Sequence, residues 1–316
     1  MSWAGARLGR RVELEILPGD GGLRQYFRLP GDGLLLLAGG DPAENLAWLR
    51  IGRHLWFKGL ALPRIYDYDP GRGFFLLEDL GDERLADPPD HSADYFQAVE
   101  VLAGLHRRGL ADFNPAWCFQ TRAYNAAMAE KQEIGYFLNS LLGRYLGWRK
   151  RPRGLAAEIK AFSRQAAAGT RDRVLMHRDY QGRNLMLNKG RVCFIDWQGA
   201  RPGPAAYDLS SLLEETPYLP LAPKLKEELV EAYLKARGPG AWRRNFRKEL
   251  RVTGAARMMQ ALGAYAKLTL AGKNKFAAYI PPLLARLRER FEERPLRPFP
   301  ALKAVIVEAE DLLKEK

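Results

Sequence analysis

Cysteine is scarce in this chain, with only Cys118 and Cys193 among its 316 residues. They lie far apart in the sequence, so they form no CxxC motif and provide no disulfide framework. This usage is typical of a reducing compartment, and we expect a cytoplasmic location. His54, His91 and His106 show no ligand spacing with one another or with cysteine, so the sequence predicts no zinc site.

Long hydrophobic runs are missing as well. The longest, GLLLLAGG at 33–40, has the length of a strand, whereas a membrane helix needs ~18 apolar residues. The basic N-terminal stretch MSWAGARLGRR is not followed by an apolar segment, so we expect no secretory signal. The composition, 47% hydrophobic and 28% charged, is that of a soluble globular protein, and no membrane partner is expected.

Basic charge, in contrast, is plentiful: 50 Lys and Arg residues against 37 Asp and Glu residues give a formal net charge of +13. Basic surfaces attract the phosphates of nucleic acids, anionic lipids or nucleotides. The densest clusters, 144–153 and 243–251, are equally compatible with a solvated helix face or loop. RNA binding would require exposed aromatic side chains between the cations, and only Trp148 and Phe246 qualify, so nucleic acid is not the expected partner.

The first eighty residues are predicted to form a small antiparallel sheet with one helix. The helix is expected over 41–60. Asp41 can be its N-cap, Pro42 fits the first helical position, and Glu44 completes a capping box. Apolar segments around Pro-Gly turns indicate a hairpin on either side of this helix. The four strands are expected at 24–29, 33–38, 64–69 and 74–80.

After the first eighty residues the apolar positions follow helical spacing. Helices are predicted over 93–109 and 121–147, and again from about residue 206 to the C-terminus. A strand-rich interval at 174–196 separates them. We therefore predict an α+β fold in two parts, a small lobe of mixed antiparallel sheet at 1–80 and a larger, mainly helical lobe at 81–316.

The octet HRDYQGRN at 177–184 places polar residues between two apolar segments. We predict that a strand ends at His177 and that a hairpin begins after Asn184. The second strand of this hairpin returns Asp196 to the neighbourhood of Asn184, so that Asp179 and the other two oxygen-bearing side chains converge. Taken singly, these residues can also be ordinary turn and cap residues.

The three converging side chains suit phosphoryl transfer. Mg²⁺ prefers hard oxygen ligands, usually one or two carboxylates together with substrate phosphates and water, so Asn184 and Asp196 are candidate metal ligands. Asp179 is then free to accept the proton of a hydroxyl group that attacks a phosphoryl group. An HRD loop followed by a metal-binding aspartate is the arrangement of protein kinases. The sequence therefore predicts a kinase that uses ATP and Mg²⁺.

HRDYQGRNLML, followed by FIDWQGARPGPAAYDLSSLL at 194–213, resembles the aminoglycoside phosphotransferase and choline-kinase-like superfamily. LRQYFRL, FFLLEDLGD and the stretch 255–287 extend the likeness over nearly the whole chain. The chain is most similar to the bacterial cell-wall amino-sugar kinases, which phosphorylate the anomeric hydroxyl of N-acetylmuramate or N-acetylglucosamine. The resemblance implies a two-lobed protein-kinase-like fold, with a nucleotide cleft between the lobes and a sugar as the acceptor.

The resemblance also implies where the nucleotide would bind. The Gly-rich stretch 19–29 would cover its phosphates, because Gly21 and Gly22 let backbone N–H groups approach an anion closely. An ordinary Gly-rich hairpin turn is the alternative. Glu78 to Leu80 would form the hinge and offer main-chain donors and acceptors to adenine.

Other residues receive roles only through this resemblance. His177 would orient the catalytic loop by hydrogen bonding, and Asp208 matches a family aspartate that acts as a helix N-cap and loop brace. Glu133, Arg183 and Arg257 are candidates for the acceptor site. Each has an alternative: Glu133 and Arg183 can face solvent, and Arg257 can brace the lobe by pairing with a buried acid.

The chain departs from the kinase pattern at the phosphate-binding lysine. Kinases hold the α and β phosphates with a lysine on the third strand, paired to a helix glutamate. Here the strand at 33–38 contains no lysine, although Glu44 resembles the partner glutamate. Arg24 and Arg28 are candidates for the missing cation, and either can equally be a solvated strand arginine.

Two other functions stay open. An aminoglycoside, choline or homoserine could be the acceptor at the same site, although a strongly basic chain is a poor match for a cationic aminoglycoside. A non-catalytic nucleotide- or RNA-binding protein of kinase shape would explain the missing lysine and the basic clusters. Such a protein has no chemical need for Asp179, Asn184 and Asp196 together. The sequence gives no indication of the oligomeric state.

Overall fold

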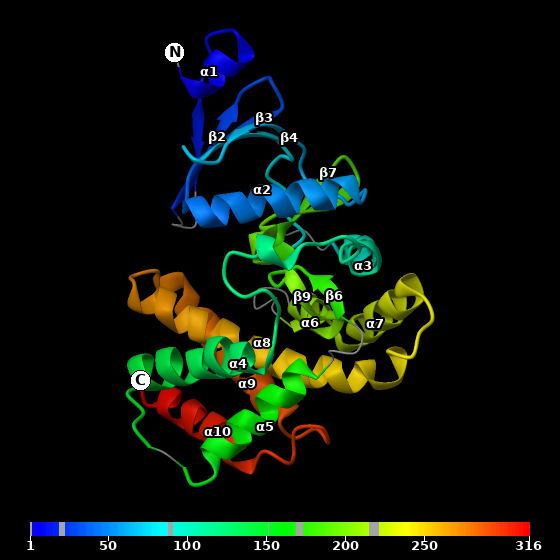
Figure 1. Ribbon diagram of the computed structural model, residues 1–316. Helices are drawn as coiled ribbons and strands as arrows, with labels where there is room; N and C mark the ends of the chain where they lie inside the picture. The colour runs from blue at the N-terminus through cyan, green and yellow to red at the C-terminus, as the bar shows by residue number, and fades with distance from the viewer. Residues whose placement is uncertain (1, 19–22, 88–90, 151, 169–172, 215–220) are drawn as a thin grey trace.

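The computed structural model describes residues 2–18, 23–87, 91–150, 152–168, 173–214 and 221–316. Within these ranges the chain forms a small lobe built on a five-stranded sheet and a larger, mainly helical lobe, which confirms the predicted fold class (Figure 1). The division of the chain after residue 80 stays a prediction.

The sheet of the small lobe is antiparallel throughout, with the strand order β1-β2-β3-β5-β4. Both predicted hairpins form, since β2 pairs with β3 and β4 pairs with β5. The short elements α1 and β1 lie outside the prediction. The bounds are α1 Trp3–Leu8, β1 Glu15–Leu17, β2 Arg24–Leu29, β3 Leu34–Gly39, β4 Ile65–Asp69 and β5 Phe74–Glu78.

Helix α2 (Pro42–Phe57) connects the two lobes. It begins as predicted at Asp41, whose carboxylate accepts the N–H groups two and three residues further on, both at 3.0 Å. Trp48 stacks on Trp197 of the larger lobe at a centroid distance of 4.6 Å, and a Cβ at Gly52 would lie 2.8 Å from the same indole. The glycine therefore permits close packing, and Figure 1 shows α2 between the sheet and the larger lobe.

The larger lobe surrounds two small β pairs with helices. The helix predicted over 121–147 begins only at Ala126, because Asn125 is its N-cap and accepts the N–H of Met128 at 2.9 Å. Much of its remainder is wound as a π-helix. In chain order the helical segments are α3 Ser92–Arg108, η1 Pro115–Trp117, α4 Ala126–Met128, η2 Ala129–Ile134, η3 Phe137–Tyr145, α5 Leu155–Ala167, η5 Gly182–Asn184, η6 Trp197–Gly199, α6 Ala205–Glu214, α7 Pro223–Arg237, α8 Arg243–Leu270, η7 Asn274–Tyr279, α9 Ile280–Arg290 and α10 Pro300–Lys314.

The two β pairs hold the HRDYQGRN octet between them. The predicted hairpin is present as β7 (Leu185–Asn188) and β8 (Arg191–Phe194). Strand β6 (Arg173–Met176) pairs with β9 (Arg201–Pro204), which lies outside the prediction. The sequence of β9, RPGP, is typical of a loop, because proline lacks the N–H group that strand pairing uses.

Some cations of the two basic clusters are paired with acidic side chains. Lys150 pairs with Glu308, Arg247 with Glu227 and Glu231, and Arg251 with Glu293. Trp148 and Phe246, the two aromatic residues considered for nucleic-acid binding, are only 6% and 1% exposed. These two side chains therefore offer no stacking surface for nucleic-acid bases. Tyr145, the third aromatic residue of the clusters, is partly buried, and Lys316 lies over its ring. Among the described helices, none is long and apolar enough to cross a membrane.

Candidate active site

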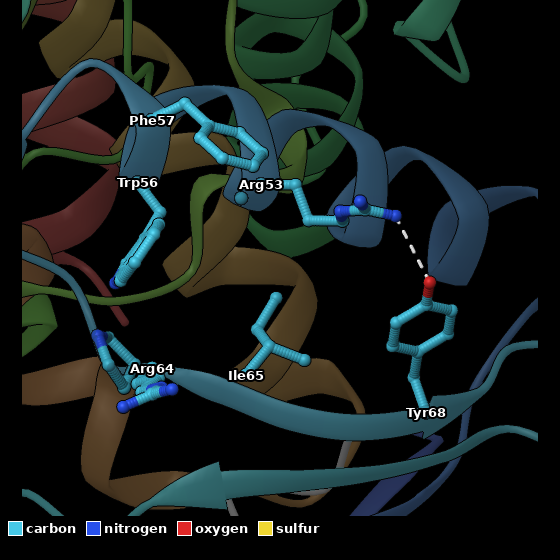
Figure 2. Close-up of a pocket in the computed structure, with 8 residues that line it drawn as sticks. Arg53, Trp56, Phe57, Arg64, Ile65 and Tyr68 are labelled. Atoms are coloured by element: carbon cyan, nitrogen blue, oxygen red, sulfur yellow. Dashed lines mark hydrogen bonds between the residues drawn. The ribbon is translucent and has the colours of Figure 1, made fainter.

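A groove between α2 and β4 is lined by aromatic, aliphatic and basic side chains (Figure 2). Its volume is about 250 Å³, and the Arg53 guanidinium donates a hydrogen bond to the Tyr68 hydroxyl at 3.0 Å. No carboxylate or amide side chain is among its lining residues, so they provide neither a proton acceptor nor a metal ligand. The side chains labelled in the figure are Arg53, Trp56, Phe57, Arg64, Ile65 and Tyr68.

Two adjoining cavities, each of about 550 Å³, lie between the lobes. The first, here called the strand-side cavity, is lined by Arg28, Glu78 and Leu80 among others. The second, here called the loop-side cavity, is lined by residues of the HRDYQGRN octet together with Leu268 and Phe276 of the larger lobe. The residues that line both are Pro18, Tyr26, Arg84, Ile195 and Asp196.

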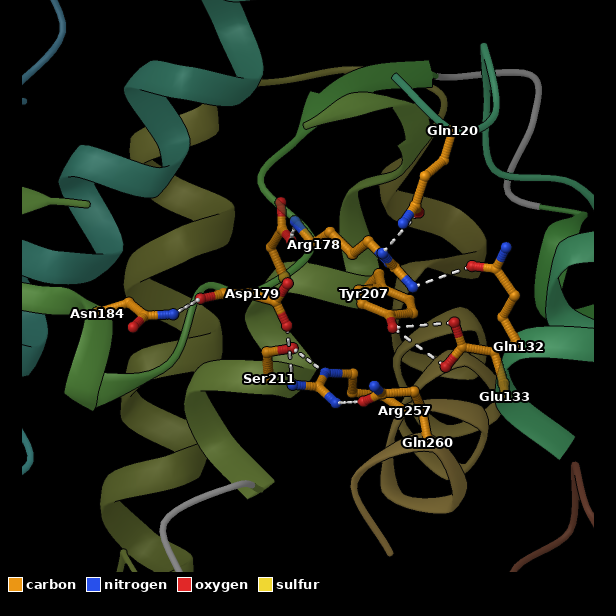
Figure 3. A network of polar contacts seen from close by, with 11 residues as sticks. Gln120, Gln132, Glu133, Arg178, Asp179, Asn184, Tyr207, Ser211, Arg257 and Gln260 are labelled. Carbon is orange, nitrogen blue, oxygen red and sulfur yellow. Dashed lines mark hydrogen bonds and ion pairs between the residues drawn. The ribbon is translucent and has the colours of Figure 1, made fainter. Parts of the chain in front are cut away.

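Asp179, Asn184 and Asp196 line the loop-side cavity together. Asn184 donates its amide N–H to the main-chain oxygen of Asp179 at 2.9 Å, as Figure 3 shows. The N–H of Ile195 is bonded to the main-chain oxygen of Asn184 at 2.9 Å, which brings the end of the hairpin back to the octet. Arg178 (φ +81°) and Asp196 (φ +67°) have left-handed backbones, a strained conformation that occurs frequently at functional sites.

Asp208 holds the octet from behind. Its buried carboxylate accepts the main-chain N–H groups of His177 at 2.7 Å and Arg178 at 2.8 Å, and it contacts His106 Nε2 at 3.0 Å. The expected brace contact is therefore present. The expectation that Asp208 is the N-cap of this helix is wrong. Helix α6 begins at Ala205, and Asp208 lies inside its first turn. Its carboxylate binds the N–H groups of the octet and not those at the start of α6.

The imidazole of His177 is oriented by packing. Both of its ring nitrogens are buried without a hydrogen-bond partner among the residues that the structure describes. The ring contacts Tyr180 and Phe194 edge to face, at 5.6 and 5.3 Å between centroids. The prediction that this side chain orients the loop by hydrogen bonding is therefore wrong, since the main-chain N–H makes that bond.

The environment of Asp179 favours its ionised form. Burial alone would raise the pKa of this carboxyl, but the charges of Arg257 and Arg178 hold it below its usual value. Arg257 Nη2 lies 3.4 Å from Asp179 Oδ1, and Arg257 Nε donates to Ser211 Oγ at 2.9 Å. Arg257 is 3% exposed. Its partner Asp179 has a side chain that is 32% exposed and lines the loop-side cavity, so it is not the buried acid that the bracing alternative named.

Glu133 lies inside the larger lobe, and Figure 3 shows its carboxylate beside the Tyr207 hydroxyl. That hydroxyl donates to the two carboxylate oxygens at 3.1 and 3.2 Å. Glu133 is 0% exposed, so the alternative of a solvent-facing glutamate is wrong. Burial raises the pKa of Glu133 to about 7. Of the three acceptor-site candidates only Arg183 lines one of the two described cavities.

The residues expected at the nucleotide lie on both cavities. Arg28, Glu78 and Leu80 line the strand-side cavity, and Arg28 is paired with Asp79 at 2.6 Å and with Asp82 at 2.8 Å. The expected phosphate-loop residues Gly21 and Gly22 lie outside the described part of the chain.

Arg24 lines the loop-side cavity. Its Nη2 lies 3.4 Å from Glu44 Oε1 and donates to Asn45 Oδ1 at 3.2 Å. The Asp41 half of the predicted capping box forms, whereas the carboxylate of Glu44 faces the strand arginine. Of the two candidate cations, Arg24 is therefore the one that lines the same cavity as Asp179.

The donor set at Asn184 and Asp196 fits Mg²⁺. Both residues line the cavity, and Asp196 Oδ1 accepts an N–H of Gln198 at 2.7 Å. The Oε1 atom of Gln198 is buried with no partner among the described residues, which leaves an oxygen for a metal-bound water. Within the same residues no three His, Cys, Asp or Glu side chains gather as a metal site. One amide and one carboxylate, completed by phosphates and water, is a set that Mg²⁺ accepts.

Several functional candidates lie outside the sequence prediction. Tyr26 and Gln198 line the cavities. His106 contacts Asp208, and Tyr207 contacts Glu133. Of these four residues, only Tyr26 could have been found from the sequence. Alternate residues of a strand share a face, and Tyr26 alternates with the candidate cations Arg24 and Arg28.

The sequence comparisons agree with this arrangement. Residues 14–246 match the phosphotransferase enzyme family. The N-acetylmuramate/N-acetylglucosamine kinase of Pseudomonas aeruginosa is 27% identical over 295 residues, which are 89% of this chain and 85% of that protein. The protein of the same name from Neisseria meningitidis serogroup B is also 27% identical and covers 96% of this chain and 93% of its own length.

Solved structures show the same fold. A choline/ethanolamine kinase family protein from Mesorhizobium loti superposes with a TM-score of 0.62 and 17% identity, covering 94% of this chain and 92% of its own. A thermostable mutant of aminoglycoside phosphotransferase APH(4)-Ia superposes with a TM-score of 0.59 and 16% identity, covering 90% of this chain and 97% of its own. The two lobes of the present chain are thus arranged as in small-molecule kinases.

Proposed function

Because the chain belongs to the phosphotransferase enzyme family, we propose that it transfers the γ-phosphoryl group of ATP to the anomeric hydroxyl of N-acetylmuramate or N-acetylglucosamine. The chain is a small-molecule kinase with a hydroxyl acceptor, and the relatives that cover most of its length are named for these two sugars. The observation that carries the proposal is that Asp179, Asn184 and Asp196 line one cavity between the lobes. The setting would be the recycling of cell-wall sugars in the cytoplasm, where ATP is available.

Asp179 acts as the base in this proposal. The acceptor oxygen attacks the γ phosphorus, its proton passes to the Asp179 carboxylate, and the bond to the bridging oxygen of ADP breaks. Arg257 and Arg178 lower the pKa of Asp179, so the carboxylate is ready to accept a proton at neutral pH. Asp208 positions the base through the main chain of the two residues before it.

Asn184 and Asp196 would hold Mg²⁺. When bound, the ion neutralises charge on the phosphate oxygens. The bond from the Asn184 amide to the Asp179 main chain fixes the Asn184 side chain and leaves its oxygen for the ion. Gln198 restrains the Asp196 carboxylate in the same manner.

The nucleotide and the acceptor would occupy the two cavities. Adenine would lie in the strand-side cavity, against main-chain groups of Glu78 to Leu80. The acceptor lies on the Asp179 side, where Leu268 and Phe276 offer apolar surface to a sugar ring and Arg183 offers a cation. Glu133 and Arg257 act from behind the cavity, through the surroundings of Asp179.

An acceptor screen with ATP and Mg²⁺, followed by phosphorus NMR of the product, tests the proposal. An anomeric sugar phosphate is the expected product. Phosphate on another sugar hydroxyl, or on choline, homoserine or an aminoglycoside, would refute the acceptor while retaining the kinase.

The role of the base is tested by Asp179→Asn, with the exposed Asp311→Asn as the matched control. The first substitution should lower kcat by at least about 10²-fold with little change in ATP affinity, because only proton transfer is lost. Near-normal turnover by Asp179→Asn would remove Asp179 from this role.

A further inference from the structure

Strand β3 (Leu34–Gly39), where a protein kinase carries the lysine, has only apolar side chains and a glycine. Leu37 of β3 is 1% exposed, and Trp48 of α2 stacks on Trp197 at 4.6 Å. The Trp197 indole N–H donates to the main-chain oxygen of Trp48 at 2.8 Å. A lysine at this interface would bring a charge into an apolar contact, so a cation for the α and β phosphates has to come from another element.

Strand β2, the neighbour of β3, presents polar side chains to both cavities. Arg24, Tyr26 and Arg28 alternate along the strand and therefore share one face. Arg24 lines the loop-side cavity, Arg28 lines the strand-side cavity, and Tyr26 lines both. This face thus runs from the catalytic octet to the expected adenine pocket, along the path that a polyphosphate chain would take.

Arg24 is held in a preformed position. Its Nε and Nη2 atoms donate to Asn45 Oδ1 at 3.3 and 3.2 Å, and Glu44 lies 3.4 Å away. Asn45 is itself buried and donates to the main-chain oxygen of Gly39 at 3.0 Å. A Cβ at Gly40 would lie 2.6 Å from Asn45 Oδ1 and 3.1 Å from Arg24 Nε, so the glycine makes room for this cluster. Side chains ordered in advance lose less entropy when a ligand binds.

Tyr26 is a neutral donor beside the proposed metal ligand. Tyr26 and Asp196 both line the two cavities, so their side chains border the same space. A phenolic hydroxyl keeps its proton at neutral pH and can donate a hydrogen bond to an anion.

We propose that Arg24 and Tyr26 together replace the strand lysine: Arg24, positioned by Glu44 and Asn45, binds the nucleotide's phosphates as the cation, and Tyr26 donates its hydroxyl to a phosphate oxygen. The proposal rests on the proposed function for the presence of a nucleotide, but it does not depend on the acceptor. A guanidinium suits this role because it presents several donors to phosphate oxygens in a fixed plane.

The test is calorimetric binding of MgADP and of adenosine, without acceptor, to the full chain. Arg24→Gln should bind MgADP at least about tenfold more weakly with adenosine unchanged, because a hydrogen bond to a charged group exceeds one decade of affinity. Arg24→Lys should recover part of the loss. Tyr26→Phe should lose about threefold to tenfold for MgADP alone. Arg53→Gln, the same change on the α2–β4 groove of Figure 2, is the matched control and should bind both ligands normally.

The outcomes separate this proposal from the proposed function. Equal weakening of MgADP and adenosine by Arg24→Gln would overturn the proposal, as would normal binding of both. If Arg24→Gln does not fold, Glu44→Gln can be measured instead, because it keeps Arg24 but removes the carboxylate that pairs with it. This variant should bind MgADP more weakly with adenosine binding unchanged. An unchanged affinity for MgADP would again overturn the proposal. A wild-type chain that binds MgADP, loses it selectively in Arg24→Gln and phosphorylates no acceptor would refute the acceptor alone. A wild-type chain that binds no nucleotide would refute both.

Discussion

Replacing Glu133 by glutamine should stabilise the chain above neutral pH. Burial raises the pKa of Glu133 from its usual 4.5 to about 7. The folded chain therefore holds this proton more tightly than the unfolded chain does. The contribution of Glu133 to the free energy of unfolding is complete below pH ~4.5 and is lost as the pH rises to about 7. The pKa of Glu133 differs by roughly 2.5 between the folded and unfolded chains. At about 1.36 kcal/mol for each pKa unit, the loss in unfolding free energy is about 3 kcal/mol.

Glutamine removes the titration while retaining the shape of the side chain. Its oxygen can still accept the Tyr207 hydroxyl, and Tyr124, whose buried hydroxyl has no partner within the described ranges, lies close enough for its pKa to be raised by Glu133. The quantity to measure is the difference in unfolding free energy between Glu133→Gln and wild type, by urea denaturation at pH 5, 6, 7 and 8.5. We expect this difference to increase by about 2.5 kcal/mol in favour of the variant from pH 5 to pH 8.5, because part of the full effect is already lost at pH 5.

Glu130→Gln is the matched control, because it makes the same change three residues earlier, at a partly exposed position. Its unfolding free energy should follow that of wild type at every pH. A difference between Glu133→Gln and wild type that stays constant from pH 5 to 8.5 would refute the argument, since it would mean that Glu133 does not titrate differently in the folded chain.

Three further substitutions test other parts of the site. Gly52→Ala places a Cβ 2.8 Å from the Trp197 ring and should lower the free energy of unfolding by about 1–3 kcal/mol in thermal or urea denaturation. Asp208→Asn loses a charged acceptor for the N–H groups of His177 and Arg178 and should reduce kcat by at least about tenfold in steady-state assays, with a smaller change in nucleotide KM. Asp196→Asn should raise the Mg²⁺ concentration needed for half-maximal activity, measured by metal titration at saturating ATP.

Controls for these substitutions lie elsewhere on the chain. Gly71→Ala should leave stability nearly unchanged, because the nearest atom to its Cβ is at 3.7 Å. Asp311→Asn, on the exposed end of α10, should leave kcat and the Mg²⁺ requirement unchanged. An Asp196→Asn chain with a normal Mg²⁺ titration would remove Asp196 from the metal site, and an Asp208→Asn chain with normal kcat would limit Asp208 to stability.

Features with local sequence signals could be predicted. The hairpins of the small lobe and the β7–β8 hairpin follow from alternating apolar residues and from turn residues between them. The start of α2 follows from Asp41 and Pro42. The gathering of Asp179, Asn184 and Asp196 follows from the same local reasoning, because a hairpin returns the chain to its starting point.

Features that depend on distant contacts could not be predicted. Strand β9 has two prolines and gains its pairing only beside β6. The burial of Glu133 depends on which side of its helix α8 covers, and a helical apolar pattern with polar interruptions does not determine this. The Arg24–Glu44 pair joins a strand to a helix and becomes visible only after both have packed.

The contact between Trp48 and Trp197 has a consequence for how such an enzyme is regulated. In protein kinases the helix that corresponds to α2 carries the glutamate partner of the lysine, and its position controls activity. Here Trp48 also packs against Phe75 of the sheet, at 5.0 Å between ring centroids. Helix α2 therefore packs against Phe75 of the sheet on one side and against Trp197, the residue after Asp196, on the other. We expect an enzyme without an on–off swing of this helix, whose output follows the supply of its substrates.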